Sequence, residues 1–276
     1  MIKLLTSHKI FIASILSKVL IFFLGDEKKI IKRNNIKYEV DLNEGIDLGI
    51  FLNIKNERKI FNIKKLINIK SRLNLIDIGS NIGSVTLPMS KLYTRSSIYA
   101  IEPTYYAYNK LITNILLNPK LKKRIKPMNY LISKSKKPKM VHSSWGLNYV
   151  KQKHKIHLGS LKKINYKNII SLDKLIKKVN KKIHFIKIDV DGFELEVLQS
   201  GIFYINKYKP IIHIEFAPYL HKEFGYSSKK LINLIRNKLK YNFYNENLKK
   251  ITDIDKYILS IKNRSENFFL IPCVKS

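Results

Sequence analysis

Acidic residues and glycines that could build a small-molecule site follow a short apolar run near residue 75. The run contains Asp77 and leads into Gly79 and Gly83, in the pattern Asp-x-Gly-x-Asn-x-Gly. Glycine lets the backbone turn sharply and approach a ligand closely. The pattern is typical of a strand, a tight turn and the start of a helix. A structural turn in any doubly wound domain is the alternative interpretation of this pattern alone.

A second strand end supplies an acid at a suitable distance. Residues 97–101 are apolar and end in Glu102 and Pro103, with Glu102 23 residues after Gly79. A doubly wound fold places an acid that accepts hydrogen bonds from a ribose diol close to this position. The glycine turn is shorter than the Gly-x-Gly-x-x-Gly pattern of dinucleotide-binding proteins. The turn and Glu102 together suit a ligand without a pyrophosphate, such as S-adenosylmethionine. The alternative role of Glu102 is electrostatic, at the start of the next helix.

Two further predicted strands end in carboxylates. Residues 184–188 are followed by Asp189, Asp191 and Glu194, and residues 210–214 are followed by Glu215. Ligands of open α/β sheets bind at the carboxyl ends of the strands. We therefore expect these four acids to face the site that begins at Gly79.

The intervening segments predict the elements that position these residues. Apolar residues at helical spacing predict helices over 85–92, 105–117, 194–200 and 227–240, and short apolar runs predict further strands over 125–132, 241–244 and 268–271. Alternation of strands and helices is typical of an α/β fold. Residues Ser133–Asn168 are rich in lysine and contain the only tryptophan, Trp145. They are our candidate for binding the substrate, with a solvated excursion as the alternative.

The first 60 residues are predicted to form a small N-terminal appendage, followed by the main domain over 61–276. Residues 10–24 are strongly apolar, but 15 residues are too few to span a bilayer, which takes about 20. No cleavage site of a signal peptide follows them. They predict a helix that packs on the domain or lies in a membrane interface, where residues 1–24 would contact an anionic surface weakly. Residues 36–42 and 46–52 predict a hairpin, and residues 57–69 a helix.

Composition bounds the class of protein. The 276 residues carry a formal net charge of +33, and 45% of them are apolar, enough for a globular core. Such charge suggests an anionic partner, but the lysines are spread along the chain, which favours a general compositional bias. The single cysteine, Cys273, cannot form an internal disulfide, and no Cys/His cluster has zinc-site spacing. We therefore expect a cytoplasmic protein, either free or peripheral at the inner face of the membrane.

Five segments together resemble the FkbM family of S-adenosylmethionine-dependent methyltransferases. They are LIDIGSNIG (75–83), YAIEP (99–103), SLDKL (171–175), FIKIDVDGFELEVL (185–198) and PIIHIE (210–215). The resemblance implies a Rossmann-like class I methyltransferase fold: a seven-stranded, mostly parallel sheet with one reversed strand and helices on both faces. It also implies methyl transfer to a hydroxyl of a sugar, a glycan or another small metabolite. Asp191 stands where the family usually has glutamate.

The resemblance also implies roles for the first two strand ends. Asp77, Gly79, Asn81 and Gly83 would hold the methionine part of S-adenosylmethionine, and Glu102 would hold its ribose hydroxyls. Ser80 and Pro103, which adjoin them, complete the predicted cofactor site.

Methyl transfer to an alcohol needs a general base within hydrogen-bond reach of the hydroxyl. Our candidates are Asp189 and Asp191, with Glu194 and Glu215 orienting or binding the acceptor. His213 is a weaker candidate, because its neighbours in the strand are apolar and a buried core histidine fits the pattern better. The four carboxylates could instead hold Mg²⁺, which takes oxygen ligands. Capping and cofactor contacts explain the acids without it, so no metal site is predicted.

Two other functions remain as alternatives. A nucleic-acid methyltransferase is suggested by the charge, but the Asn/Asp-Pro-Pro-Tyr/Phe segment of amino-methylating enzymes is replaced by Asp-Val-Asp-Gly at 189–192. Carbon-5 pyrimidine methylation needs a cysteine nucleophile in the site, whereas Cys273 lies at the end of the chain. The second alternative is a membrane-associated subunit of a glycan-assembly system that keeps the fold without turnover.

Overall fold

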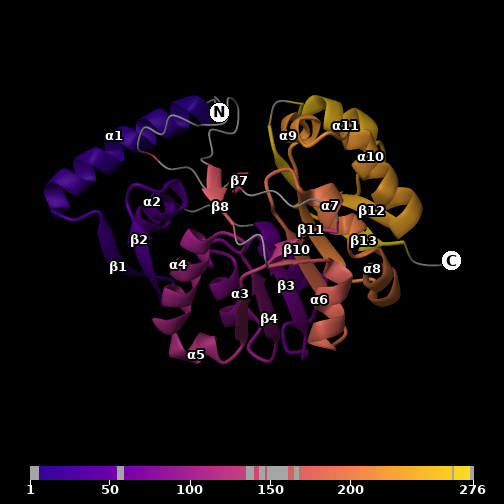
Figure 1. Ribbon diagram of the computed structural model, residues 1–276, viewed down its shortest axis with the longest axis horizontal. Helices are drawn as coiled ribbons and strands as arrows, with labels where there is room; N and C mark the ends of the chain where they lie inside the picture. The colour runs from indigo at the N-terminus through magenta and orange to yellow at the C-terminus, as the bar shows by residue number, and fades with distance from the viewer. Residues whose placement is uncertain are drawn as a thin grey trace.

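The computed structural model describes residues 6–54, 59–134, 140–142, 147, 161–164, 168–262 and 264–273. Its centre is a seven-stranded sheet with the order β12-β13-β11-β10-β3-β4-β5 (Figure 1). All neighbouring strands are parallel except β13, which runs antiparallel to both β11 and β12. The strands are β3 (Asn74–Ile78), β4 (Ser97–Ile101), β5 (Ile125–Met128), β10 (Phe185–Ile188), β11 (Ile211–Phe216), β12 (Tyr241–Asn245) and β13 (Glu266–Pro272). The predicted seven-stranded, mostly parallel sheet with one reversed strand is confirmed.

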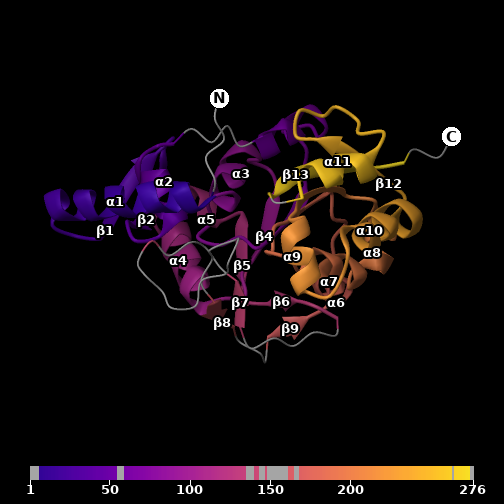
Figure 2. The same cartoon turned by 90° about the horizontal axis from the view of Figure 1, so that it is seen from above.

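Helices cover both faces of this sheet, because successive strand residues point to opposite sides. On one face, Ile76, Ile186 and Ile212 pack with α6 (Leu172–Val179), α7 (Glu194–Gln199), α8 (Ile202–Tyr208) and α10 (Ser228–Asn233). On the other face, Leu75 and Phe185 pack with η1 (Lys59–Lys65) and α3 (Thr86–Leu92). Seen from above, α3 lies on one side of the sheet and α6 and α7 on the other (Figure 2).

The N-terminal segment differs from its prediction. Strand β1 (Lys28–Arg33) pairs antiparallel with β2 (Ile36–Asp41), whereas residues 45–51 form a helix, α2 (Gly45–Phe51). The predicted hairpin of 36–42 with 46–52 is therefore wrong. The actual turn is Asn34-Asn35, both with positive φ, as a two-residue hairpin with right-handed twist requires. Leu48 of this helix is buried against α1 (Thr6–Leu24), and Asp47 pairs with Lys110, so tertiary contacts fix 45–51 as a helix.

Strand β2 docks on the main domain through asparagine side chains of α4 (Tyr105–Leu116) and of the residues that follow it. Asn114 Oδ1 accepts a hydrogen bond from Glu39 N at 2.7 Å, and Asn118 Oδ1 accepts one from Lys37 N at 2.9 Å. Four helical residues rise about 6 Å, close to the roughly 6.7 Å between alternate residues of a strand. The side chains of one helix therefore match every second N–H of the strand.

The other predicted elements match closely in most places. The predicted strand 125–132 divides into β5 and β6 (Leu131–Ile132), which pairs with β9 (Ile169–Ile170). The predicted helix 57–69 is described as the 3₁₀ helix η1, and 227–240 is α10 followed by a π-helical turn, η2 (Leu234–Leu239). Helix α11 (Ile254–Ser260), between β12 and β13, was not predicted. Further elements are α5 (Pro119–Lys122), β7 (Met140–His142), β8 (Leu161–Lys163) and α9 (Pro218–Glu223).

Two observations concern the predicted peripheral regions. Trp145 and most of the surrounding candidate substrate region lie outside the described residues, so that prediction stays open. Among the helices that the structure describes, none is both long and apolar enough to cross a bilayer.

Candidate active site

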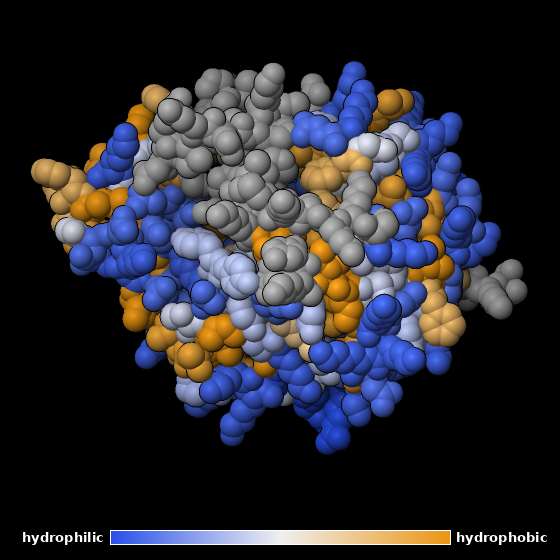
Figure 3. All heavy atoms as spheres, in the orientation of Figure 1, coloured by the Kyte–Doolittle hydropathy of each residue, from blue (hydrophilic) through white to orange (hydrophobic). Residues whose placement is uncertain are grey.

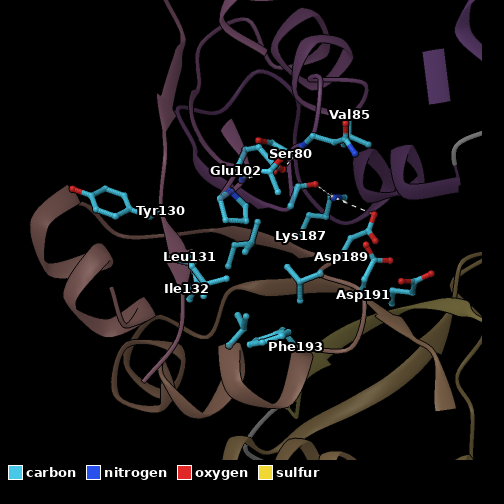
Figure 4. Close-up of a pocket in the computed structure, with 18 of the residues that line it drawn as sticks. Ser80, Val85, Glu102, Tyr130, Leu131, Ile132, Lys187, Asp189, Asp191 and Phe193 are labelled. Atoms are coloured by element: carbon cyan, nitrogen blue, oxygen red, sulfur yellow. Dashed lines mark hydrogen bonds and ion pairs between the residues drawn. The ribbon is translucent and has the colours of Figure 1, made fainter. Parts of the chain in front are cut away.

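A cavity of about 240 Å³ opens at the carboxyl ends of β3, β4 and β10 (Figure 4). It brings together most of the residues that the sequence singled out. From the predicted cofactor set, Gly79, Ser80, Asn81, Glu102 and Pro103 line it, and from the predicted catalytic set, Asp189, Asp191 and Glu215 do. Asp77, Gly83 and Glu194 are outside the lining.

Gly79 joins the two halves of the cavity. Its φ is +77°, and a Cβ atom there would lie 1.9 Å from the backbone oxygen of Asp189. Asp189 N in turn donates to Ile78 O at 3.2 Å. Both the backbone conformation and the close approach require glycine at this position. The glycine turn after β3 is thus in direct contact with the acidic turn after β10.

The turn at 79–83 is held by its own hydrogen bonds. Its five backbone N–H groups all donate within the protein: Gly79 and Ser80 to Ile101 O, Asn81 to Glu102, Ile82 to Asn81 Oδ1, and Gly83 to Ser80 O. Ser80 Oγ is different, since it is buried without a hydrogen-bond partner among the described residues. A buried hydroxyl without a partner costs free energy, and Ser80 lines the cavity, so a polar ligand that reaches this hydroxyl would be favoured.

Glu102 is fixed at the end of β4. Its carboxylate accepts hydrogen bonds from Asn81 N at 2.9 Å, Thr104 N at 3.0 Å and Thr104 Oγ1 at 2.6 Å. Burial raises the pKa of this carboxyl above its ordinary value. A carboxylate has about four acceptor sites, so three internal bonds leave capacity for a ligand hydroxyl.

Lys187 is a central residue of the site that sequence reasoning missed. It is buried in β10, and its Nζ atom lies 3.2 Å from Asp77 Oδ1 and 3.2 Å from Asp189 Oδ2. It also donates to Gly79 O at 2.9 Å. Burial alone would lower its pKa, but the charges of Asp189 and Asp77 raise it above the ordinary value. The signal available in the sequence was a lysine inside the otherwise apolar run 185–188. In the structure this lysine pairs in register with Asp77 of β3.

Asp189 is the carboxylate best placed to meet a substrate. Its side chain is 46% exposed while one oxygen contacts Lys187. Burial would raise its pKa, but the charge and hydrogen bond of Lys187 hold it below the ordinary value. Glu215 differs, because burial and the charges of Asp189 and Asp191 raise its pKa well above the ordinary value. Oxygen atoms of the Asp189 and Glu215 carboxyl groups lie within 4.8 Å of each other. Lys187 therefore favours the charged form of Asp189, while burial favours the protonated form of Glu215.

Three of the predicted catalytic carboxylates form one group. Ligand oxygens of Asp189, Asp191 and Glu215 all lie within 4.8 Å of one another. Asp191 has a φ of +48°, a strained backbone conformation of the kind that clusters at functional sites. In Figure 4 its side chain lies next to that of Asp189.

Glu194 is separated from this group. It is fully buried, and its Oε1 accepts a hydrogen bond from Gly192 N at 3.2 Å, while its Oε2 accepts one from Tyr226 at 3.3 Å. Burial raises its pKa to about 7. Glu194 therefore fits the role of a structural carboxylate that fixes the turn at 190–192. Its geometry does not fit contact with an acceptor.

Two other sequence candidates lie away from the cavity. His213 is 4% exposed and packs edge-on against Phe269, which confirms that it is a core residue. Its ring nitrogens lack a hydrogen-bond partner among the described residues, and Nε2 lies 3.4 Å from Glu246 Oε1. Cys273 is exposed and is outside the cavity lining.

The remaining wall of the cavity is apolar. Leu131, Ile132, Val190, Phe193 and Val197 line it, and Ile46 of α2 adds a contact from the N-terminal segment. Sequence reasoning missed this wall because apolar residues after a strand look like any other core residues. A ligand with a flat apolar ring and a polar, hydroxyl-bearing end would match the two sides.

Comparison with known proteins gives one match to a family. Residues 77–244, more than half of the chain, match the methyltransferase FkbM domain. A comparison with curated proteins gives no match.

Several solved structures are similar. A methyltransferase FkbM from Methylobacillus flagellatus KT is 16% identical, with a TM-score of 0.47 over 74% of this chain and 45% of that chain. This chain therefore spans less than half the length of that protein. Magnesium protoporphyrin IX methyltransferase from Synechocystis PCC 6803, with bound SAM, is 10% identical (TM-score 0.45, 83% and 82% covered). The METTL16 methyltransferase domain is 11% identical (TM-score 0.49, 99% and 84% covered).

Proposed function

The chain belongs to the FkbM methyltransferase family, and from this premise we propose that it methylates a hydroxyl group of a sugar, a glycan or another small metabolite. S-adenosylmethionine is the methyl donor. The single observation that carries the proposal is the cavity that places Asp189, ionised and 46% exposed, beside the glycine turn and Glu102. This arrangement supplies a base on one side and a cofactor site on the other.

The residues of the cavity fit S-adenosylmethionine. Glu102 has acceptor capacity left for the ribose hydroxyls. Ser80 Oγ, buried without a partner among the described residues, would bond to the amino acid end of the cofactor. The apolar wall that includes Ile132 and Phe193 would pack against the adenine ring. When bound, the cofactor supplies an electrophilic methyl group on a sulfonium.

The acidic group would act on the acceptor. Asp189 uses one carboxylate oxygen to contact Lys187, and its other oxygen would take the proton of the acceptor hydroxyl, leaving an ether in the product. Lys187 keeps Asp189 ionised and fixes its position. Burial favours the protonated form of Glu215, which would limit the negative charge that the acceptor meets. Positioning of the hydroxyl in line with the methyl group supplies most of the rate.

Cofactor binding is the first test. A ligand that binds only the folded state stabilises it, by about 2.7 kcal/mol at 100 times Kd. We expect S-adenosylmethionine to raise Tm in a concentration-dependent way, as S-adenosylhomocysteine should. An unchanged Tm at millimolar cofactor would refute the proposal.

The acceptor side needs a second test. Purified protein and cofactor with a labelled methyl group are incubated with carbohydrate fractions, and label in acid-stable ether linkages is measured. Asp189→Asn should lower kcat about 10²- to 10⁴-fold, the usual contribution of a general base, while cofactor affinity stays within about threefold. Asp191→Asn is the matched variant. If kcat falls only in that variant, Asp191 is the general base in place of Asp189. If both variants keep full activity, the acids are not the base.

A further inference from the structure

Helix α1 carries apolar side chains over most of its circumference but is covered on one side only. Its inner side packs on Leu42 and Leu48 through residues such as Ile10 and Leu20. Its outer side is exposed and consists of Phe11, Ile12, Ile15, Val19, Phe22 and Phe23. Because helical residues advance by about 100° each, these six side chains fall within a sector of about 120°. We call this sector the α1 face.

The α1 face is unusual for a surface in water. Phe22 is 82% exposed and Phe23 78% exposed, and the two rings contact each other edge to face. Single exposed apolar residues are common on proteins, but a contiguous patch marks a surface that binds something apolar. A helix whose apolar side chains extend well beyond the side that packs on its own domain normally buries the rest against another apolar surface.

Positive charge borders the α1 face. Lys18 is exposed at its edge, and in strand β1 the exposed Ile30 lies between Lys28 and Lys32 on the same side of the strand. Residues 6–33 contain six lysines and arginines and only two acids. In Figure 3, orange apolar atoms at the end of the molecule occupied by α1 and β1 alternate with blue polar atoms.

We propose that the α1 face docks on an anionic lipid bilayer, with the helix parallel to the membrane plane. The six apolar side chains would enter the boundary between headgroups and acyl chains, and the lysines would contact lipid phosphates. A second copy of the chain fits less well. Face-to-face pairing would bring two sets of lysines together, whereas anionic lipid neutralises them.

The docking surface is close to the candidate active site. Helix α1 lies at the same end of the molecule as α9, which follows the carboxyl end of β11, while α5 lies at the opposite end (Figure 1). Helix α2 packs against α1 and contributes Ile46 to the cavity wall. Docking would therefore hold the cavity near the membrane. The inference does not depend on the chemistry of the site.

Sedimentation with vesicles tests the proposal. The full chain should co-sediment with vesicles of phosphatidylcholine and phosphatidylglycerol and bind phosphatidylcholine alone much more weakly. Phe22→Ser/Phe23→Ser should weaken binding about tenfold or more, since each substitution removes a ring that docking would bury in the bilayer. The matched control is Phe203→Ser, which removes a 61% exposed phenylalanine from α8 and should bind like the wild type. Tm should be unchanged in both, which shows that the variants fold.

Charge is tested separately. Lys28→Glu/Lys32→Glu should weaken binding to anionic vesicles and reduce its salt dependence, whereas Lys181→Glu/Lys182→Glu, with the same change in net charge, should have little effect. Binding of Phe22→Ser/Phe23→Ser at wild-type strength would overturn the proposal. The proposal would also be overturned if the wild type did not bind vesicles and sedimented as a dimer while this variant was monomeric. The α1 face would then be covered by a second copy of the chain.

Discussion

The Nζ atom of Lys187 lies 3.2 Å from Oδ2 of Asp189, its neighbour two residues further along the chain. The same ammonium group contacts Asp77 on the adjacent strand at 3.2 Å. One buried cation thus connects the glycine-turn strand to the carboxylate that faces the cavity. Both the stability of the sheet and the ionisation of Asp189 depend on it.

Replacing Lys187 by methionine should destabilise the protein and change its pH profile. The substitution leaves Asp77 buried without its cation, and breaking a buried pair typically lowers the free energy of unfolding by about 3–5 kcal/mol. Loss of the cation also raises the pKa of Asp189, so the acidic limb of the activity profile should move to higher pH. Urea denaturation and rates between pH 5 and 9 measure the two effects. Lys181→Met, at an exposed position, is the control, and equal stability of the two variants would contradict the prediction.

Replacing Gly79 by alanine should damage the site directly. The new Cβ would meet the backbone oxygen of Asp189 at 1.9 Å, and the residue would keep a φ of +77°. Overpacking and the left-handed conformation together should cost about 2–4 kcal/mol and separate the two turns. Gly49→Ala is the matched control. It lies in α2 with no atom within 4 Å of the new Cβ, and alanine should stabilise the helix by up to about 1 kcal/mol.

Glu194 should make stability fall as pH rises. Its pKa is about 7 in the folded protein against an ordinary value of 4.5, so the folded state holds this proton more tightly than the unfolded chain. The contribution is fully present below pH 4.5 and is lost as pH rises through 7. It amounts to about 3 kcal/mol.

The comparison of wild type with Glu194→Gln isolates this group, because Asp47, with a pKa raised to about 6, contributes in the same direction in both proteins. Urea denaturation at several values between pH 4.5 and 8 should give a smaller loss of stability for the variant. Parallel curves would show that Glu194 does not titrate in this range.

Glu102→Gln should weaken cofactor binding. The amide keeps one acceptor oxygen in place of two, so it cannot satisfy Asn81 N, Thr104 and a ribose hydroxyl together. Loss of a hydrogen bond to a charged group costs about 1.5–3 kcal/mol, which corresponds to roughly 10- to 150-fold in Kd. Calorimetric titration with S-adenosylmethionine measures it. Thr104→Val removes a donor to the same carboxylate without removing an acceptor and should have a smaller effect.

Chelation of divalent cations should leave methyl transfer within about twofold. Asp189, Asp191 and Glu215 are close enough to share a cation, but Lys187 already offsets the charge of Asp189, and burial favours the protonated form of Glu215. Activity with EDTA is compared with activity after Mg²⁺ is added back. Loss with EDTA that Mg²⁺ restores would show that the group holds a metal.

The sequence indicated one half of the site better than the other. The glycine turn and the acids at 102, 189, 191 and 215 were predictable, because the carboxyl ends of parallel strands meet at one edge whatever the rest of the chain does. Lys187 was not, because its role depends on register: only pairing of β3 with β10 brings it beside Asp77. Glu194 illustrates the reverse case, since a carboxylate at the start of a helix looks the same in sequence whether it faces a ligand or a buried turn.

The fold shows the same division. Strands with unbroken apolar runs were located within about two residues. The N-terminal hairpin was misplaced because β1 has the sequence KKIIKR, which carries little apolar signal, while the apolar run at 46–52 resembles a strand. That run is helical because tertiary contacts decide its conformation: Leu48 is buried against α1, and Asp47 pairs with Lys110.

The hydrogen bonds from β2 to the side chains of Asn114 and Asn118 affect how copies of this protein can associate. An unpaired strand edge is a template on which another chain can add a strand and begin a fibril. One edge of β2 is paired with β1, and Asn114 and Asn118 occupy N–H groups of the other. Two side-chain amides thus protect this strand from intermolecular sheet growth. Replacing both asparagines by leucine should therefore favour aggregation before it affects the chemistry of the site.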